Sequence, residues 1–413
     1  MKREANLIEQ IADTQNLYWA FWKAKRGKNS NSQVIKFRED LYVQILLLRD
    51  EILNGKIEVG NYHFFKIFDP KERQICAAPF RERVLHHAIM NICHQNFEKF
   101  QTPDSFATRQ GKGTYAAVYR ALSMQGKFDY FVKIDCKKYF DSIDHGILKM
   151  QLVRRFKDER FLELLFKIID SYETTVGKGL PIGNLTSQYF ANHYLAHGDH
   201  FLKEKNKLPA MVRYMDDLLL WHNNPKHLAA ISTTIEDWCY SQLALTFKHR
   251  YMNTTKHGVS FLGFYLCKHH IELSRKSKQR LIYKYNSIQK DYKQGILSEK
   301  QYSTKLESIL VRPCKARTFH FRNKLFRNIN EGTNATGRQL LEQCQELSET
   351  AGPDRPDQPA FGHLGLDQPG SARDQAPVSE TEGAARRDRG LDRQQDRLAD
   401  PDHLDRQEMA ERR

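Results

Sequence analysis

Two stretches of the sequence place acidic side chains where apolar strands end. In "RYMDDLLLW", residues 213–221, Asp216 and Asp217 lie between two apolar runs, and in "YFVKIDC", residues 130–136, Asp135 ends another. A single aspartate in such a place is most often a solvated turn residue. Three carboxylates brought together would repel one another unless divalent cations neutralised them. Two Mg²⁺ ions bridged by such carboxylates form the clamp used for in-line phosphoryl transfer, so we expect these three acids to form a catalytic metal site.

The charge of the chain favours a polyanionic partner. Its 413 residues include 65 Lys and Arg against 50 Asp and Glu, for a net charge of +15. The surplus is confined to residues 1–330, with a net charge of +22, whereas residues 331–413 have a net charge of −7. Nucleic acid is the first expectation for such a basic segment, and an anionic membrane is the second.

Neither a membrane span nor a secretory leader is expected. No run of about 18 apolar residues occurs, and the N-terminal stretch "MKREANLIEQIADTQ" is charged and has no apolar core. The seven cysteines are scattered without a Cys-x-x-Cys pair, so neither a zinc site nor a disulfide framework is expected. We therefore predict a cytoplasmic protein with reduced thiols and no membrane partner.

Around the three acids, the pattern of apolar residues predicts an α+β protein. Helical spacing is found in residues 16–27, 37–55, 81–100, 145–156, 160–172, 185–204, 226–243 and, with many basic residues, from 275 to about 327. Strands are predicted as a hairpin over residues 63–80 with Asp69-Pro70 at its turn, a buried strand over 130–135, a second hairpin around Asp216, and short strands at 259–266 and 270–274. Because strands and helices do not alternate regularly, we expect an α+β core rather than a βαβ winding.

The residues around the three aspartates resemble the motifs of reverse transcriptases. "YMDD" is similar to their C motif, and "FVKIDCKKYFDSIDHGIL" is similar to their A motif. The other motifs follow in the family's order: "RQICAAPFRERVLHHAI" and "SFATRQGKGTYAAV" resemble the two finger motifs, "GLPIGNLTSQYFANHYL" motif B, "LALTFKHR" motif D and "FLGFYL" the primer grip. Four residues such as YMDD recur by chance, but this ordered resemblance covers most of residues 60–270.

The resemblance implies a right-hand polymerase with fingers, an antiparallel palm sheet and a helical thumb. We assign residues 1–60 to an N-terminal helical extension, 61–128 to the fingers, 129–270 to the palm (with part of the fingers inserted around 150–180) and 271–330 to the thumb. Basic residues interleaved with aromatic ones in the thumb suit contact with a duplex backbone. Residues 331–413 are of low complexity and contain one aromatic residue, so we expect a disordered tail.

The resemblance also assigns metal ligands and nucleotide contacts. Asp135 and Asp216 would bind both Mg²⁺ ions, and Asp217 would complete the cluster. Arg73 and Arg109 match finger positions whose guanidinium groups hold the incoming deoxynucleoside triphosphate (dNTP), a task that suits a rigid, always-charged fork. The alternative for each arginine is a surface charge in a basic domain.

Further positions match the family's nucleotide site and primer site. Lys71 and Lys112 are additional candidates for the triphosphate cradle. Phe140 falls where the family keeps an aromatic residue under the sugar as a gate against a 2′-hydroxyl, although a core would also favour an aromatic residue there. Lys248 matches the motif D lysine that protonates pyrophosphate, or is a solvated strand residue. The primer end would lie against Phe261, Leu262 and Gly263, where glycine permits close backbone approach.

Motif B departs from the usual family pattern. Most reverse transcriptases have Pro-Gln-Gly, whose glutamine contacts the incoming nucleotide and template, but this chain has Pro181-Ile182-Gly183. An apolar surface replaces a hydrogen-bonding check on the new base pair and discriminates by only a few kcal/mol. The alternative is that Ile182 simply packs. Gln188, the motif B glutamine of the "SQ" pair, would lie near the template or nucleotide, or be a helix-surface amide.

"LPIGNLTSQ" closely resembles the form found in reverse transcriptases of diversity-generating retroelements of bacteria and phages. The resemblance implies an enzyme that copies a structured template-repeat RNA into cDNA with errors at template adenines, after which the cDNA replaces a variable repeat of a target gene by retrohoming. It also implies a small basic accessory protein that forms a barrel-like oligomer. DNA or cDNA primers and dNTPs would be the remaining partners.

Two other functions are compatible with the same motifs. The first is a retron-type or phage-defence reverse transcriptase, and "LPIGNLTSQ" argues against retrons because their motif B differs. The second is a non-catalytic palm domain that binds structured RNA. The complete set of three acids argues against it, because a binding module gains nothing from three mutually repelling carboxylates.

Overall fold

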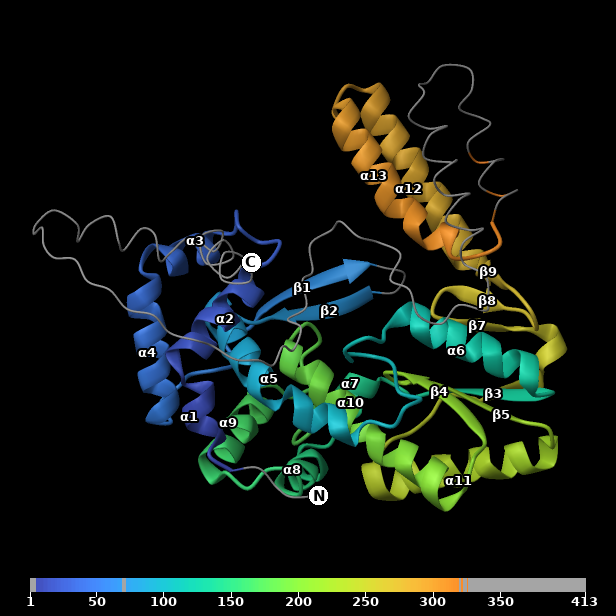
Figure 1. Cartoon of the computed structure of the whole chain (residues 1–413), viewed down its shortest axis with the longest axis horizontal. Helices are drawn as coiled ribbons and strands as arrows, with labels where there is room; N and C mark the ends of the chain where they lie inside the picture. Colours follow the sequence, from blue (N-terminus) through green and yellow to red (C-terminus); the bar gives the residue numbers. More distant parts are fainter. Residues whose placement is uncertain (1–4, 69–71, 319–320, 322–324, 326–413) are drawn as a thin grey trace, which may run out of the picture. The chain divides into compact units, whose positions relative to one another are not determined.

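Figure 1 shows the computed structural model of the chain, which describes residues 5–68, 72–318, 321 and 325. All described residues belong to one compact unit. The predicted tail (residues 331–413), Lys71 and the Asp69-Pro70 turn lie outside the described residues.

A four-stranded antiparallel sheet carries the three acids. Its strand order is β4-β5-β3-β6. The bounds are β3 (Tyr130–Asp135), β4 (Ala210–Tyr214), β5 (Asp217–His222) and β6 (Tyr251–Thr254). The pairing sets Asp135 opposite Asp217 and Phe131 opposite Trp221. The strands predicted at 130–135 and around Asp216 are confirmed.

Alternating side chains of this sheet enter two different hydrophobic cores, as the period of two in a strand requires. One face contributes to the larger core Val132, Ile134, Met211, Leu218 and Leu220. That core also contains side chains of α8 (His145–Val153), α9 (Glu159–Asp170), α10 (Leu185–His200) and α11 (Pro225–Leu243). The other face contributes Phe131, Val212, Leu219 and Trp221 to a second core, which is shared with α6 (Thr114–Lys127) and a second sheet.

That second sheet has three short antiparallel strands and leads into a helical pair. The strands are β7 (Val259–Phe261), β8 (Phe264–Leu266) and β9 (Ile271–Leu273). The predicted basic stretch after them forms two helices, α12 (Arg275–Lys293) and α13 (Glu299–Cys314), which pack against each other through a small core of their own. A capping box of Ser298 and Gln301 starts α13, and Gly295, with a φ of +70°, lies in the break that precedes it.

The N-terminal residues form a helical group and a hairpin. The helices are α1 (Leu7–Ile11), α2 (Thr14–Lys25), α3 (Ser32–Glu39), α4 (Leu41–Leu53) and α5 (Phe80–Phe100), and the hairpin consists of β1 (His63–Phe68) and β2 (Glu72–Ala77). The single helix predicted over 37–55 is wrong in its first residues. Asp40 has a non-helical backbone conformation (φ −114°, ψ 36°), so Phe37 belongs to α3 and the next helix begins at Leu41.

The α+β class is confirmed, since antiparallel sheets are mixed with helices throughout the described residues. The sequence did not predict α6, the four-residue α7 (Tyr139–Ser142) or β6. The buried residues of α6 are Ala117, Val118, Ala121, Met124 and Gln125, so few large apolar side chains mark its buried face. β6 is too short to show alternation. No helix within the described part of the chain is long and apolar enough to cross a membrane.

Candidate active site

The strand register brings the three acids together at the end of the central sheet. Tyr214 is paired with Asp217, which leaves Met215 and Asp216 as a two-residue turn between β4 and β5. Asp217 is in turn opposite Asp135 on β3. The register therefore places all three predicted residues at one end of this sheet.

Met215 holds this turn in an unusual backbone conformation. Its φ is +55°, in the left-handed region that normally favours glycine or asparagine. Such a conformation costs of order 1–3 kcal/mol and persists only where the surroundings fix it. The surroundings of this turn should therefore contain the group that fixes it.

Arg213 is that group, and the sequence analysis missed it. Its side chain is fully buried, and its guanidinium Nη1 donates to the Met215 carbonyl oxygen at 3.0 Å. The same guanidinium binds the buried carboxylate of Asp199 on α10, with Nε–Oδ1 and Nε–Oδ2 distances of 2.8 Å and an Nη2–Oδ2 distance of 2.7 Å. It also donates to Asn192 Oδ1 at 2.7 Å. An arginine inside an otherwise apolar strand was the signal that could have identified it.

The backbone of Arg213 is tied to a neighbouring segment as well. Its N–H donates to the Asp104 carbonyl, and its own carbonyl accepts from the Phe106 N–H. Asp104 is itself buried and pairs with Arg120 and Lys203. A polar network that joins α10, α6 and the segment around residue 104 thus fixes the turn that contains Asp216.

The negative charges of the three aspartates favour the binding of cations. Burial, followed by the negative charges of Asp217 and Asp135, raises the pKa of Asp216 to about 6. Two lysines partly offset these charges: Lys248 Nζ lies 2.6 Å from Asp135 Oδ2, and Lys133 Nζ lies 3.2 Å from Asp217 Oδ1. An oxygen-only donor set is what Mg²⁺ prefers. The three aspartates therefore fit divalent metal binding.

Comparison with known protein families gives a match that includes the three acids. Residues 69–266 match the family described as Reverse transcriptase (RNA-dependent DNA polymerase). These residues form a reverse transcriptase domain. It contains the central sheet, the buried arginine network and all three acids.

Individual relatives are distant, and the match covers less than half of each of them. A putative COX1/OXI3 intron 1 protein of Saccharomyces cerevisiae is 24% identical over 48% of this chain and 25% of its own length. Protein YkfC of Escherichia coli is 25% identical over 40% of this chain and 47% of its own. The group II intron-encoded protein LtrA of Lactococcus lactis is 25% identical over 38% of this chain and 28% of its own. The chain thus spans less than half the length of these relatives.

A solved structure with a similar chain path is the apo telomerase of Candida tropicalis. Its sequence identity is 12%, its TM-score is 0.43, and the match covers 70% of this chain and 62% of the telomerase.

Arg109 and Lys112, two of the residues predicted to bind the triphosphate, are engaged in contacts within the protein. Arg109 makes a two-pronged bond to Glu98 Oε1, with Nε and Nη2 at 2.8 and 2.6 Å, and its Nη1 donates to the Thr102 and Ser105 carbonyls. Lys112 donates to the carbonyl oxygens of Pro103 and Ser105. In this conformation both side chains stabilise the loop itself, so the structure does not present them to a triphosphate.

Arg73 and Gln188 are exposed, on β2 and α10 respectively. Phe140, on α7, is partly buried and packs against the larger core while its carbonyl accepts from the Leu180 N–H at 2.8 Å. Ile182 is half-buried, and its carbonyl accepts from the Cys76 N–H of β2 at 2.8 Å. The motif B loop is therefore bonded on one side to α7 and on the other to the β1–β2 hairpin.

Phe261, Leu262 and Gly263, the predicted primer site, lie where β7 turns into β8. Leu262 and Gly263 form a two-residue turn between β7 and β8, both with positive φ. A Cβ at Gly263 would lie 2.9 Å from the Arg312 guanidinium. Arg312 donates to the Leu262 carbonyl at 2.5 Å, so this turn is fixed to α13. Lys133 connects it to the acids, because Lys133 Nζ also donates to the Ser260 carbonyl at 3.2 Å.

Lys248 provides a test of how the acids bind cations. Because its ammonium competes with a divalent cation for Asp135, Lys248→Met should lower the Mg²⁺ concentration needed for half-maximal thermal stabilisation by several-fold. The measurement is a melting curve at increasing Mg²⁺ concentration. Lys256→Met, at an exposed lysine, is the matched control and should leave the midpoint unchanged. Equal midpoints for Lys248→Met and wild type would show that the ion pair does not compete with metal.

Proposed function

We propose that the protein is an RNA-directed DNA polymerase. The observation that carries this proposal is the register that sets Asp135 opposite Asp217, with Asp216 in the adjoining turn, inside a reverse transcriptase domain. Reverse transcriptases use divalent metal ions, and we propose two Mg²⁺ ions held by these three carboxylates. When bound, the ions would activate the primer hydroxyl and stabilise charge on the leaving pyrophosphate.

The chain's own residues suit the remaining tasks of such an enzyme. Lys248, which already contacts Asp135, would deliver a proton to the departing pyrophosphate. The turn of Phe261, Leu262 and Gly263 would hold the primer end, while Arg73 and the exposed aromatic residues of the β1–β2 hairpin would contact nucleotide and template. The net charge of +22 over residues 1–330 supports an RNA template and a nucleic-acid primer as partners.

We further propose that this polymerase belongs to a diversity-generating retroelement and makes errors at template adenines. The support is Ile182, whose side chain replaces the amide of the usual motif B and whose loop is bonded both to Phe140 on α7, through Leu180, and to Cys76 on β2. A small basic accessory protein is proposed from the same resemblance. Template-repeat copying and retrohoming into a target gene would follow from this assignment.

Ile182→Gln is the test of this assignment. We expect it to restore a hydrogen-bonding side chain beside the new base pair and to reduce misincorporation opposite adenine by about tenfold, which corresponds to about 1.4 kcal/mol of discrimination. The measurement is the error spectrum of wild type and variant on one primed RNA. Val176→Gln, which adds an amide at a fully exposed valine, is the control. An unchanged adenine error rate in Ile182→Gln would remove the reason for placing the enzyme in this class.

The alternatives predict other results. A retron-type or phage-defence enzyme would copy RNA without errors concentrated at adenines. A non-catalytic RNA-binding palm would incorporate no dNTP at all. The same primed-RNA assay therefore separates all three.

A further inference from the structure

The β8–β9 hairpin gathers three metal-ligating side chains far from the three acids in the sequence. Leu266 is paired with Ile271, and both are buried in the second core. The next residues of the hairpin, Cys267 and His270, also face each other: the Cys267 N–H donates to the His270 carbonyl at 3.0 Å. Because side chains alternate across a strand, Cys267, His270 and Glu272 share the face opposite to the buried one. All three are partly exposed.

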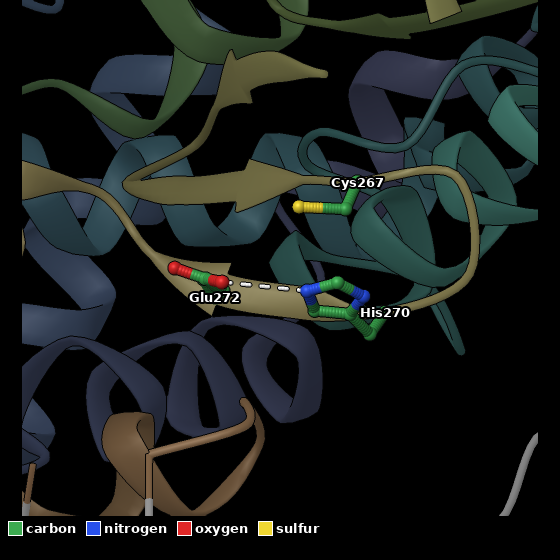
Figure 2. A group of neighbouring side chains, drawn as sticks. All are labelled: Cys267, His270 and Glu272. Carbon is green, nitrogen blue, oxygen red and sulfur yellow. Dashed lines mark hydrogen bonds and ion pairs between the residues drawn. The ribbon is translucent and has the colours of Figure 1, made fainter. Parts of the chain in front are cut away.

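Their ligating atoms are close enough to share one ion. The Cys267 sulfur, a ring nitrogen of His270 and a Glu272 carboxylate oxygen all lie within 4.8 Å of one another. His270 Nε2 is 3.3 Å from Glu272 Oε1, as drawn in Figure 2, where the Cys267 sulfur lies on the adjacent strand. Lys278, at the start of α12, places its ammonium 3.4 Å from Glu272 Oε2. A cation already lies beside this carboxylate.

We propose that Cys267, His270 and Glu272 bind one Zn²⁺ ion. Sulfur, imidazole nitrogen and carboxylate oxygen are the donor types that zinc accepts, whereas Mg²⁺ prefers oxygen alone. The three aspartates and this cluster therefore select different metals. Binding would release the Cys267 thiol proton, displace Lys278 from Glu272 and leave the fourth position to water. The sequence contains no Cys-x-x-Cys pattern at this site, because only one ligand is a cysteine and the other two, His270 and Glu272, follow it after the hairpin turn.

The position of the cluster indicates what the ion would do. β9 ends at Leu273, and Ser274 immediately caps α12. Ser274 N–H and Ser277 Oγ both donate to the Gly263 carbonyl, at 3.2 and 2.6 Å. Zinc would cross-link the two strands that lie between the Leu262-Gly263 turn and the first residues of α12, and so stiffen the base of the α12–α13 pair. This role does not depend on polymerase activity.

The first test is the zinc content of the untagged full-length chain. We expect wild type to retain one more equivalent of zinc after exhaustive dialysis than Cys267→Ser or His270→Gln. His269→Gln is the matched control, because His269 is the exposed neighbour in the hairpin turn and lies outside the cluster. Identical zinc content in wild type, Cys267→Ser and His270→Gln would overturn the proposal.

The second test identifies the ligands directly and separates the site from the three acids. Co²⁺ added to the Asp216→Asn protein should give a thiolate-to-cobalt charge-transfer band that disappears in Asp216→Asn/Cys267→Ser. In EDTA, Cys267→Ser and His270→Gln should melt like wild type, which shows that they fold, and Zn²⁺ should raise the melting temperature of wild type and His269→Gln only. Absence of the band, or an equal rise in all four proteins, would refute the site.

Discussion

Replacing Asp216 by asparagine should abolish primer extension while making the metal-free protein more stable. Asp216 lies in the turn next to Asp217, which is paired with Asp135, and a neutral amide there removes one of the carboxylates proposed to hold the metal ions. Metal stabilisation of transition-state charge is worth several kcal/mol, so we expect dNTP incorporation on a primed RNA to fall on the order of a thousandfold or more. Activity that survives Asp216→Asn would contradict the proposed mechanism.

The stability effect has the opposite sign and depends on pH. Burial and the two neighbouring acids raise the pKa of Asp216 from 3.8 to about 6, so its charged form is disfavoured in the folded state. The stabilisation from protonated Asp216 is present at low pH and is lost as the pH rises through about 6. At pH 7 in EDTA, Asp216→Asn should therefore unfold with a free energy higher by up to ~3 kcal/mol.

This gain should shrink as the pH falls from about 6 towards 4, because wild-type Asp216 then takes up a proton. The measurement is urea unfolding of both proteins across this range, without metal. Asp237→Asn, at an exposed aspartate on α11, controls for a general change in net charge. A difference between Asp216→Asn and wild type that does not vary with pH would show that the buried charge is not its source.

Replacing Arg213 by methionine should be the most destabilising single change near the site. It leaves the carboxylate of Asp199, only 1% exposed, without the guanidinium that binds it through three contacts. Breaking a buried ion pair from one side costs about 3–5 kcal/mol, and we expect a loss of that size in the free energy of unfolding at pH 7. Arg154→Met, at an exposed arginine, should have little effect.

Two further variants separate the charge effect from the shape of the turn. Asp199→Asn combined with Arg213→Met removes the orphaned charge and should recover part of the stability. It should not recover activity, because the Met215 carbonyl still lacks its donor and the turn bearing Asp216 is no longer fixed at its positive φ. Primer extension measured well below each melting temperature tests this, and full activity in the double variant would show that Arg213 has no positioning role.

The local pattern of the sequence was sufficient to predict the elements that carry the acids. Apolar strands ending in aspartate predicted β3 and the β4–β5 hairpin, and helical spacing predicted the larger helices. These predictions succeed because alternation and helical periodicity depend on neighbours along the chain. Where the signal is short or made of small residues, as in β6 and α6, the same reasoning found nothing. It also extended one helix across the break at Asp40.

The sequence alone was thus sufficient to single out the three acids, to predict the α+β class and to show that Ile182 replaces the usual motif B glutamine. Only the tertiary structure decided which charges are available and which are engaged. The sequence suggested Arg109 as a cation for a triphosphate, but its guanidinium is bound to Glu98. Arg213 was not singled out by the sequence, but its guanidinium donates to the Met215 carbonyl in the turn that contains Asp216. The physical reason is that the partner of a charged side chain can come from any distance along the chain: Arg213 and Asp199 are 14 positions apart, and Lys248 and Asp135 are 113 positions apart.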